Sequence, residues 1–450
     1  MTAIKKLRLP PAAIIALSLL AAILVGTALL CIPAATRSGE VNFLAAFFTA
    51  TSATCVTGLA VVDTGSYWSY FGQAIILVLM QIGGLGLITI LSVFFLYVQK
   101  RASLSKRKLV MQSAGSVSLE GIRSLVKYIL IGTVACEVIG AFLLSFAFVP
   151  DMGWGMGIWQ SVFTAVSSFC NCGFTLTGRF GQDSLNAYVS DPLVCLVVCL
   201  LIIIGGIGFF VWGDMIKNGV HFKRYSFHSK VVLTTTGALI VVGWALFMAL
   251  EWNNPGTIGD KDVGTKLLAT FFMSITPRTA GFNTVTYSSM SNGGGMLTIL
   301  LMFIGGSPGS TAGGVKTTTL AVIFLSAIAT SRRRNETHIF NRRFDDDAYP
   351  QAGAVFSIYL TAIMISALII SAIESAAGYT SHEIVFEVVS AIGTVGLSCG
   401  ITASLSAASQ VILICLMFLG RVGGFTLILV FSNERKPVSI ARVADNLIIG

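Results

Sequence analysis

The chain has 450 residues, of which only 11% are charged while 55% are hydrophobic. Soluble globular proteins average about 25% charged residues, so this chain has too little polar surface to be one of them. Disorder goes with low hydrophobicity and high charge, so the same numbers exclude a disordered chain. The net charge of +9 would suit nucleic-acid binding, but the basic residues lie in short tracts between long apolar runs, as in the loops of membrane proteins. We therefore expect an all-α polytopic membrane protein that contacts membrane lipids and binds no nucleic acid.

Apolar runs long enough to cross a bilayer core of roughly 30 Å occur eight times. Seven of them are continuous and cover 12–32, 72–98, 128–149, 193–216, 231–250, 352–373 and 409–431. The eighth, 296–330, is interrupted by a run of Gly and other small residues. Four shorter apolar segments between the spans are too short to cross and too apolar for ordinary loops, which favours re-entrant segments. These segments cover 41–54, 157–170, 263–276 and 381–393.

The basic residues predict the orientation of the chain. Most of the 29 Lys and Arg lie in the N-terminal segment, in the alternate loops 100–127, 217–230 and 332–343, and in the C-terminal tail. By the positive-inside rule both termini are then cytoplasmic. The opposite face is rich in acidic residues: Glu40, Asp63, Asp151, Asp183, Asp191, Asp260 and Asp262.

A fourfold repeat runs through the chain. Each short segment is followed by a Gly and a large apolar residue, and these glycines are Gly58, Gly173, Gly281 and Gly396. Ten residues before each glycine stands a Phe: Phe48, Phe163, Phe271 and Phe386. Six residues before it, three repeats carry a hydroxyl (Ser52, Ser167 and Ser390), and the third repeat has Ile275. The following span carries Ile82-Gly83-Gly84, Ile204-Gly205-Gly206, Ile304-Gly305-Gly306 and Leu419-Gly420-Arg421 in turn.

This pattern predicts four units, each made of a span, a short helix, an extended loop and a second span, around a central pore. The units cover 11–110, 111–225, 226–340 and 341–435, between a cytoplasmic N-terminus (1–10) and a C-terminal tail (436–450). Non-helical backbone survives at membrane depth only where it lines water or is buried in protein. Four such loops around one axis can present rings of carbonyl oxygens that replace the hydration shell of a cation. The predicted filter residues are Val56, Thr57, Gly58, Asn171, Cys172, Gly173, Thr279, Ala280, Gly281, Thr394, Val395 and Gly396.

With these motifs, over about residues 10–450, the chain resembles the Trk/Ktr/HKT superfamily of potassium transporters, and most closely the bacterial Ktr-type (KtrB/KtrD-like) pore subunits. The resemblance implies potassium uptake across the plasma membrane, because all four filter positions are Gly. Only Thr394-Val395-Gly396 matches the Thr-Val-Gly of potassium channels, so discrimination against sodium is expected to be less strict. The resemblance also implies a homodimer and a separate cytoplasmic ring of nucleotide-binding regulatory subunits. It implies no cofactor, with potassium as the transported ion and sodium as a candidate stimulatory ion.

The interrupted span is predicted to line the cavity beneath the filter, because its Gly, Pro and Ser residues cannot sustain a helix. In the family the corresponding stretch is a movable gate, which the resemblance assigns to Gly305, Gly306, Ser307, Pro308, Gly309, Ser310, Thr311, Ala312, Gly313 and Gly314. A static helix break is the alternative. Arg421 stands where the other units have Gly84, Gly206 and Gly306, and it is expected to form a charge barrier, a structural pair with a carbonyl, or both. Lys316 can snorkel to the cytoplasmic face.

Three other interpretations compete with the potassium pore. Residues 305–309 spell G-x-S-x-G, the nucleophile pattern of some hydrolases, but no His stands at a suitable position, and we expect no enzyme. Cys170-x-Cys172 could bind a metal, yet it lacks a second pair of ligands. A transporter of sodium, ammonium or another solute stays open, although such proteins usually have twofold inverted repeats.

Overall fold

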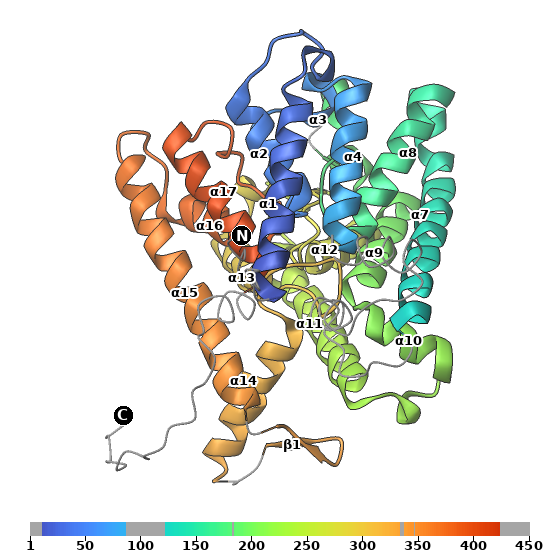
Figure 1. Ribbon diagram of the computed structural model, residues 1–450, viewed down its shortest axis with the longest axis vertical. Coiled ribbons are helices and arrows are strands. Elements are labelled where there is room, and N and C mark those ends of the chain that lie inside the picture. The colour runs from blue at the N-terminus through green and yellow to red at the C-terminus, as the bar shows by residue number, and fades with distance from the viewer. Residues whose placement is uncertain (1–10, 87–121, 182–183, 334–336, 346, 424–450) are drawn as a thin grey trace, which may run out of the picture.

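The computed structural model describes residues 11–86, 122–181, 184–333, 337–345 and 347–423, and this part of the chain is almost entirely helical (Figure 1). Among these described residues, three helices are long and apolar enough to cross a membrane: α7 (Ile122–Met152), α11 (Phe227–Glu251) and α15 (Ala348–Ile373). Shorter apolar helices are α1 (Pro11–Leu30), α4 (Tyr70–Leu85), α13 (Asn292–Phe303), α14 (Thr317–Ser331) and α17 (Ala407–Val422). The predicted spans 72–98 and 409–431 run beyond the described residues, so only their first parts, α4 and α17, are described.

All four segments that were predicted to be re-entrant form short helices. They are α2 (Phe43–Thr54), α8 (Trp154–Phe169), α12 (Val263–Ile275) and α16 (Ser381–Gly393). Three of them begin at a side chain that accepts a hydrogen bond from the first turn, which is how polar residues satisfy the free N–H groups of a helix start. These capping residues are Asn42, Asp262 and Thr380, the last in a capping box with Glu383.

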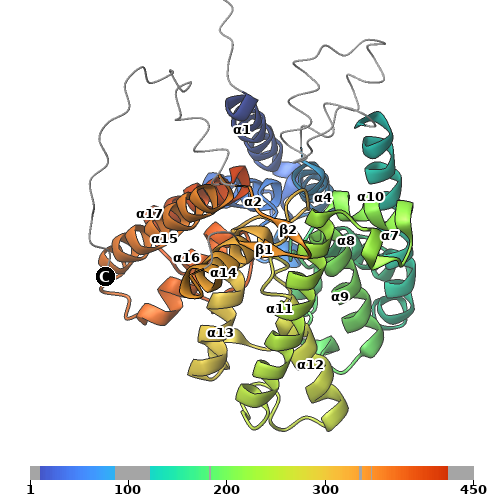
Figure 2. The same ribbon diagram turned by 90° about the horizontal axis from the view of Figure 1, so that it is seen from below.

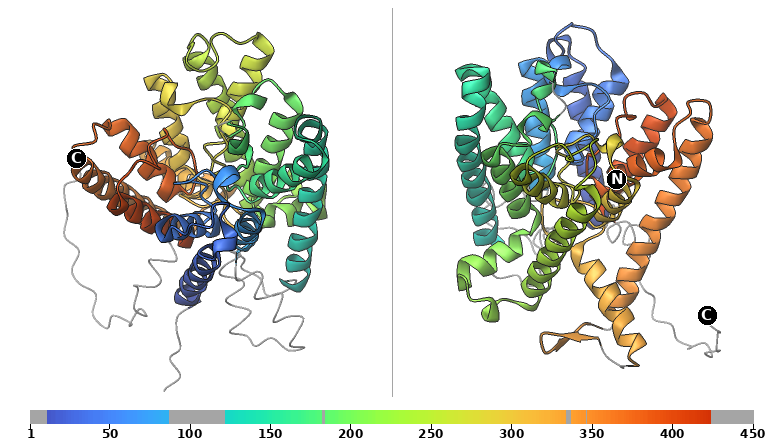
Figure 3. Two further views of the ribbon diagram at one scale, coloured as in Figure 1. Left: turned by 90° about the horizontal axis from the view of Figure 1, so that it is seen from above. Right: turned by 180° about the vertical axis from the view of Figure 1, so that it is seen from behind.

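The helices follow one another around the centre of the molecule in chain order, as the colours in Figure 2 and in the left view of Figure 3 make visible. Within each quarter the first helix packs against the short helix that follows it: α1 on α2, α7 on α8, α11 on α12 and α15 on α16. The next helix then packs against the short helix of the following quarter: α4 on α8, α9 on α12, α13 on α16 and α17 back on α2. The last of these contacts closes the circle.

The predicted span 193–216 is not a single helix, and that expectation is wrong. It divides into α9 (Pro192–Gly206) and α10 (Phe209–Asn218), which meet at an angle of 96°. Gly208 has φ +96°, a conformation that side chains disfavour. The carbonyl oxygens of Gly205 and Gly206, which would otherwise continue the helix ladder, accept hydrogen bonds from the chain at Thr311 and Ser307.

The predicted break in 296–330 is confirmed, because α13 ends at Phe303 and α14 begins at Thr317. The remaining elements are short: α3 (Thr64–Tyr67), the 3₁₀ helices η1 (Pro33–Ala35), η2 (Thr177–Phe180), η3 (Asn186–Tyr188), η4 (Phe222–Arg224) and η5 (Tyr287–Ser289), and an antiparallel hairpin of β1 (His338–Ile339) and β2 (Arg342–Arg343). The hairpin is the one departure from the all-α expectation in the described residues. It lies at the lower end of the molecule in Figure 1.

Candidate functional site: a ring of four loops

Each predicted filter triplet follows one of the short helices, after at most one residue in three units and after three residues in the third unit. The triplets begin at Val56, Asn171, Thr279 and Thr394, and all four of these residues are buried. The C-terminal end of each short helix therefore faces its own triplet, and the partial negative charge of a helix C-terminus suits a cation there.

The four triplets share one backbone conformation. The first residue of each is left-handed, with φ +56° at Val56, +58° at Asn171, +66° at Thr279 and +52° at Thr394. The third residue is a glycine with φ of +91°, +83°, +76° and +92° in chain order. A non-Gly residue in this region is uncommon and costs free energy. Its recurrence at four equivalent positions indicates that one strained loop geometry is built four times.

The glycines close a ring. A Cβ atom added to Gly58 would lie 1.9 Å from the carbonyl oxygen of Cys172, the residue before the next glycine. The same relation recurs with Gly173 against the Ala280 oxygen at 2.7 Å, Gly281 against the Val395 oxygen at 2.4 Å, and Gly396 against the Thr57 oxygen at 2.2 Å. Each triplet thus contacts the next, and the fourth contacts the first. Only a residue without a side chain allows this approach.

The repeated hydroxyls support the ring in two units. Ser52 Oγ accepts a hydrogen bond from the N–H of Gly58 at 3.0 Å, and Ser390 Oγ accepts one from the N–H of Gly396 at 3.1 Å. The third unit, which lacks this Ser, uses Thr276, whose hydroxyl donates to the carbonyl oxygen of Phe282 at 2.7 Å. Ser167 Oγ is buried without a hydrogen-bond partner in the described part of the chain.

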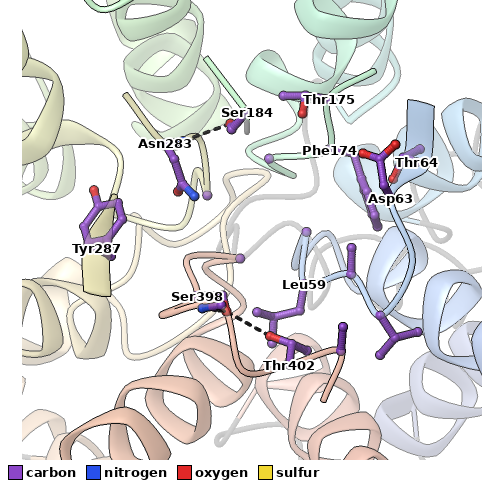
Figure 4. A pocket seen from close by; sticks show the side chains of 18 of the residues that line it. Leu59, Asp63, Thr64, Phe174, Thr175, Ser184, Asn283, Tyr287, Ser398 and Thr402 are labelled. Atoms are coloured by element: carbon purple, nitrogen blue, oxygen red, sulfur yellow. Dashed lines mark hydrogen bonds between the residues drawn. The ribbon is translucent and has the colours of Figure 1, made fainter. Parts of the chain in front are cut away.

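Above the ring lies a cavity of about 340 Å³, which we call the vestibule. All four ring glycines line it, together with the residues that follow them in each loop, and Figure 4 shows loops from the four quarters converging on it. Labelled side chains on its wall include Asp63, Asn283, Tyr287, Ser398 and Thr402. The wall is an almost even mixture of polar and apolar residues, and its one carboxylate is Asp63.

On the other side of the ring, the interrupted span forms a buried loop (residues 304–316). The N–H groups of Ser307 and Thr311 donate to the carbonyl oxygens of Gly206 and Gly205, and the N–H of Phe209 donates to the carbonyl oxygen of Gly309. A Cβ atom added to Gly313 would lie 2.1 Å from the hydroxyl oxygen of Thr394. The loop therefore lies directly against the filter residues of the fourth unit and is bonded to the bend between α9 and α10.

Two half-buried cations, Arg421 and Lys316, bind carbonyl oxygens of this loop. The guanidinium of Arg421 donates to the carbonyl oxygens of Thr311 and Gly83, and to that of Gly84 at 3.5 Å. Lys316 Nζ donates to the carbonyl oxygen of Ala312 at 2.6 Å. The expectation that Lys316 snorkels to the cytoplasmic face is therefore wrong, because its ammonium group is bound to carbonyl oxygens of the loop.

The competing motifs are explained by packing. Ser307 is fully buried, and its hydroxyl shares a hydrogen bond with Thr317 at 3.0 Å rather than with an imidazole, so it is not placed as a nucleophile. The Cys170 thiol donates to Gln81 Oε1 at 3.1 Å. No group of three or more His, Cys, Asp and Glu suitable for a metal occurs within the residues that the structure describes.

The fold is that of a known class of membrane transporter. A crystal structure of the potassium transporter TrkH from Vibrio parahaemolyticus matches 95% of this chain and 86% of its own with a TM-score of 0.73, at 18% sequence identity. At that sequence identity the similarity establishes a shared fold and nothing about function.

The sequence comparisons identify the family. The TrkH family of cation transport proteins matches residues 14–439. The chain is 41% identical to Ktr system potassium uptake protein B of Bacillus subtilis over 96% of this chain and 97% of that protein. It is 42% identical to potassium/sodium uptake protein NtpJ of Enterococcus hirae over 98% of both chains. The chain belongs to the TrkH family of cation transport proteins. It is a multi-pass membrane transporter and not an enzyme.

Proposed function

We propose that this chain takes up potassium through a pore whose selectivity filter is the ring of the four triplets. The observation that carries the proposal is the closed contact of each ring glycine with the carbonyl of the next triplet. Backbone carbonyl oxygens arranged in rings can replace the hydration shell of a dehydrated potassium ion. The two relatives are named for potassium uptake and for potassium/sodium uptake, which supports potassium as the transported ion.

The proposed architecture has four units around the pore, with eight transmembrane helices and four re-entrant loops. The unit boundaries are those proposed from the sequence: 11–110, 111–225, 226–340 and 341–435. The cyclic packing of the short helices supports this arrangement. The vestibule would face the outside of the plasma membrane and both termini the cytoplasm, in keeping with the positive-inside rule.

Residues 305–314 of the loop 304–316 would be the gate of this pore, and Arg421 part of its barrier. The loop lies against Thr394 of the filter, and Arg421 adds a positive charge close to it. A charged side chain at membrane depth is costly and usually functional. Because Arg421 bonds the carbonyl oxygen of Thr311, the charge would also hold the gate in its closed position.

The pore would work with partner subunits. The relative from Bacillus subtilis is named as part of a Ktr system, and we extend this to a homodimer controlled by a cytoplasmic ring of nucleotide-binding subunits. Nucleotide control would come from these separate chains, since the sequence holds no Rossmann-type G-x-G-x-x-G after a strand. No cofactor is proposed; potassium is the transported ion, and sodium is a candidate stimulatory ion.

Ion flux into liposomes that contain only this chain tests the proposal. Potassium should enter faster than sodium at equal gradients, and Gly58→Ser should reduce that preference while the amount of inserted protein stays the same. Equal or greater flux of sodium or ammonium would instead support the transporter for another ion. A preference that Gly58→Ser leaves unchanged would refute the assignment of the filter.

A further inference from the structure

Glu387 is a buried carboxylate in the short helix α16, with only 1% of its surface exposed. It accepts three hydrogen bonds from the loop that follows the fourth triplet. Ser398 Oγ donates at 2.5 Å, the N–H of Cys399 at 3.1 Å and Thr402 Oγ1 at 2.7 Å. One side chain of the short helix thus binds three points of one loop.

This loop, residues 398–402, forms part of the vestibule wall and begins two residues after Gly396 of the ring (Figure 4). An internal hydrogen bond also closes the loop, because Ser398 Oγ accepts from the N–H of Gly400 at 2.8 Å. The network is therefore continuous from the interior of α16 to the surface that an entering ion meets.

The other three units have no counterpart of Glu387. Nine residues before the ring glycine they carry Thr49, Thr164 and Phe272. Burying a carboxylate is expensive even when it is fully hydrogen-bonded. The other three units have a neutral residue at this position, so the carboxylate of the fourth needs a reason other than stability.

We propose that Glu387 is a positioning residue for ion selectivity, which fixes the outer loop of the fourth unit and through it the carbonyl geometry at Gly396. The inference rests on the proposed filter. A site that must hold its geometry within a fraction of an ångström needs a surrounding set of hydrogen bonds that locks it. Because the other three units have no carboxylate at the position of Glu387, only the fourth quarter of the vestibule is held in this way.

Glu387→Gln tests the proposal, with Glu383→Gln as the matched control. Glu383 lies one helical turn earlier and serves the capping box, where Gln is also accepted, so the control removes the same charge from the same helix. In liposomes the ratio of potassium flux to sodium flux should fall about threefold or more in Glu387→Gln, while the control keeps the wild-type ratio.

A second readout is labelling of Cys399 by an impermeant thiol reagent, quantified on the peptide that contains it. The thiol is 8% exposed in the native protein, and its labelling should rise severalfold in Glu387→Gln.

Two milder variants, Ser398→Ala and Thr402→Val, each remove one donor and leave the carboxylate in place. Each should lower the potassium-to-sodium flux ratio by less than Glu387→Gln does. If Glu387→Gln does not insert into the membrane, these two variants test the proposal in its place. Wild-type ratios in all folded variants would overturn the proposal, and so would increased labelling of Cys399 with no change in the ratio. If the wild-type chain itself shows no potassium preference, the proposed filter function fails, while the labelling of Cys399 still reports whether Glu387 holds the loop.

Discussion

The guanidinium of Arg421 donates a hydrogen bond to the main-chain carbonyl oxygen of Thr311, which precedes it by 110 positions in the chain. The same side chain also donates to the carbonyl oxygen of Gly83 in α4. Arg421 thus joins three units of the fold beneath the ring. The sequence left two interpretations of Arg421 open. These hydrogen bonds are the expected structural pair with a carbonyl, whereas the charge barrier is a prediction that substitution can test.

Replacing Arg421 with Ala should raise the basal potassium flux. The change removes a positive charge near the ion path and releases the loop at Thr311, and each 1.4 kcal/mol or so of barrier removed raises a rate about tenfold. Arg421→Lys keeps the charge but cannot bridge Thr311 and Gly83 with one planar group. Flux per inserted protein in liposomes measures both variants. If the flux rises only in Arg421→Ala, the positive charge is the barrier. If it rises equally in Arg421→Ala and Arg421→Lys, the barrier is the bridge between Thr311 and Gly83. A collapse in the yield of Ala with normal flux in Lys would assign Arg421 to folding.

Gly58→Ser should reduce the preference for potassium over sodium. Gly58 has φ +91°, and its added Cβ would meet the Cys172 carbonyl at 1.9 Å, so this oxygen must move. Gly39→Ser is the matched control, since Gly39 has φ +75° but no atom within 4 Å of the added Cβ. The control carries a similar backbone strain and should leave the ion preference unchanged. Competition between the two ions in one flux assay measures the ratio, and equal effects of the two variants would attribute the loss to strain rather than to the ring.

Much of this site could be predicted from the sequence because it is repeated. The spacing of ten residues between a Phe and a ring glycine occurs four times, beginning at Phe48, Phe163, Phe271 and Phe386. It marks the short helices and the triplets because each unit packs in the same way. The structure brings the triplets together in the order that the repeat implies. The role of Ser52 and Ser390, six residues before their glycines, is likewise visible in the pattern.

Features that belong to one unit only could not be predicted in this way. The bend between α9 and α10 depends on hydrogen bonds from Ser307 and Thr311, which are about a hundred residues away in the chain, and the local sequence of 193–216 reads as a continuous apolar helix. Glu387 was missed although it left a signal. It stands one residue after the repeated Phe386, as the one charged residue at that position among the four repeats.

Acid should weaken the contact between α15 and α17. Glu374, which follows α15, accepts hydrogen bonds from Ser406 and Ser409 at the start of α17, and these bonds lower the pKa of its carboxyl. A lowered pKa in the folded state means stability that is present above the usual pKa of a Glu and is lost as the pH falls through the folded value. We expect Glu374→Gln to lower the melting temperature at neutral pH by about 1 °C. The melting temperatures of the variant and the wild type should converge below the pKa of Glu374. The exposed Glu40, changed to Gln, controls for the loss of one charge, and a difference that persists unchanged into acid would contradict the assignment.

Deleting several residues from 307–313 should open the pore. The loop is bonded to Gly205 and Gly206 through the N–H groups of Thr311 and Ser307, and it lies against Thr394 of the ring. A gate needs two arrangements whose populations a regulator can shift through its differential affinity, and the deletion removes the closed one while leaving the four triplets in place. Basal potassium flux should therefore rise, the preference for potassium should be retained, and the response to the regulatory ring should shrink, as flux measured with and without the partner would report. Thr311→Val, which removes only the hydroxyl that donates to the carbonyl oxygen of Phe169, should give a smaller change in the same direction. If the deleted chain inserts normally and both its basal flux and its response to the partner equal those of the wild type, the loop is a static break in the helix, and the gate must lie at Arg421 or in the cytoplasmic loops.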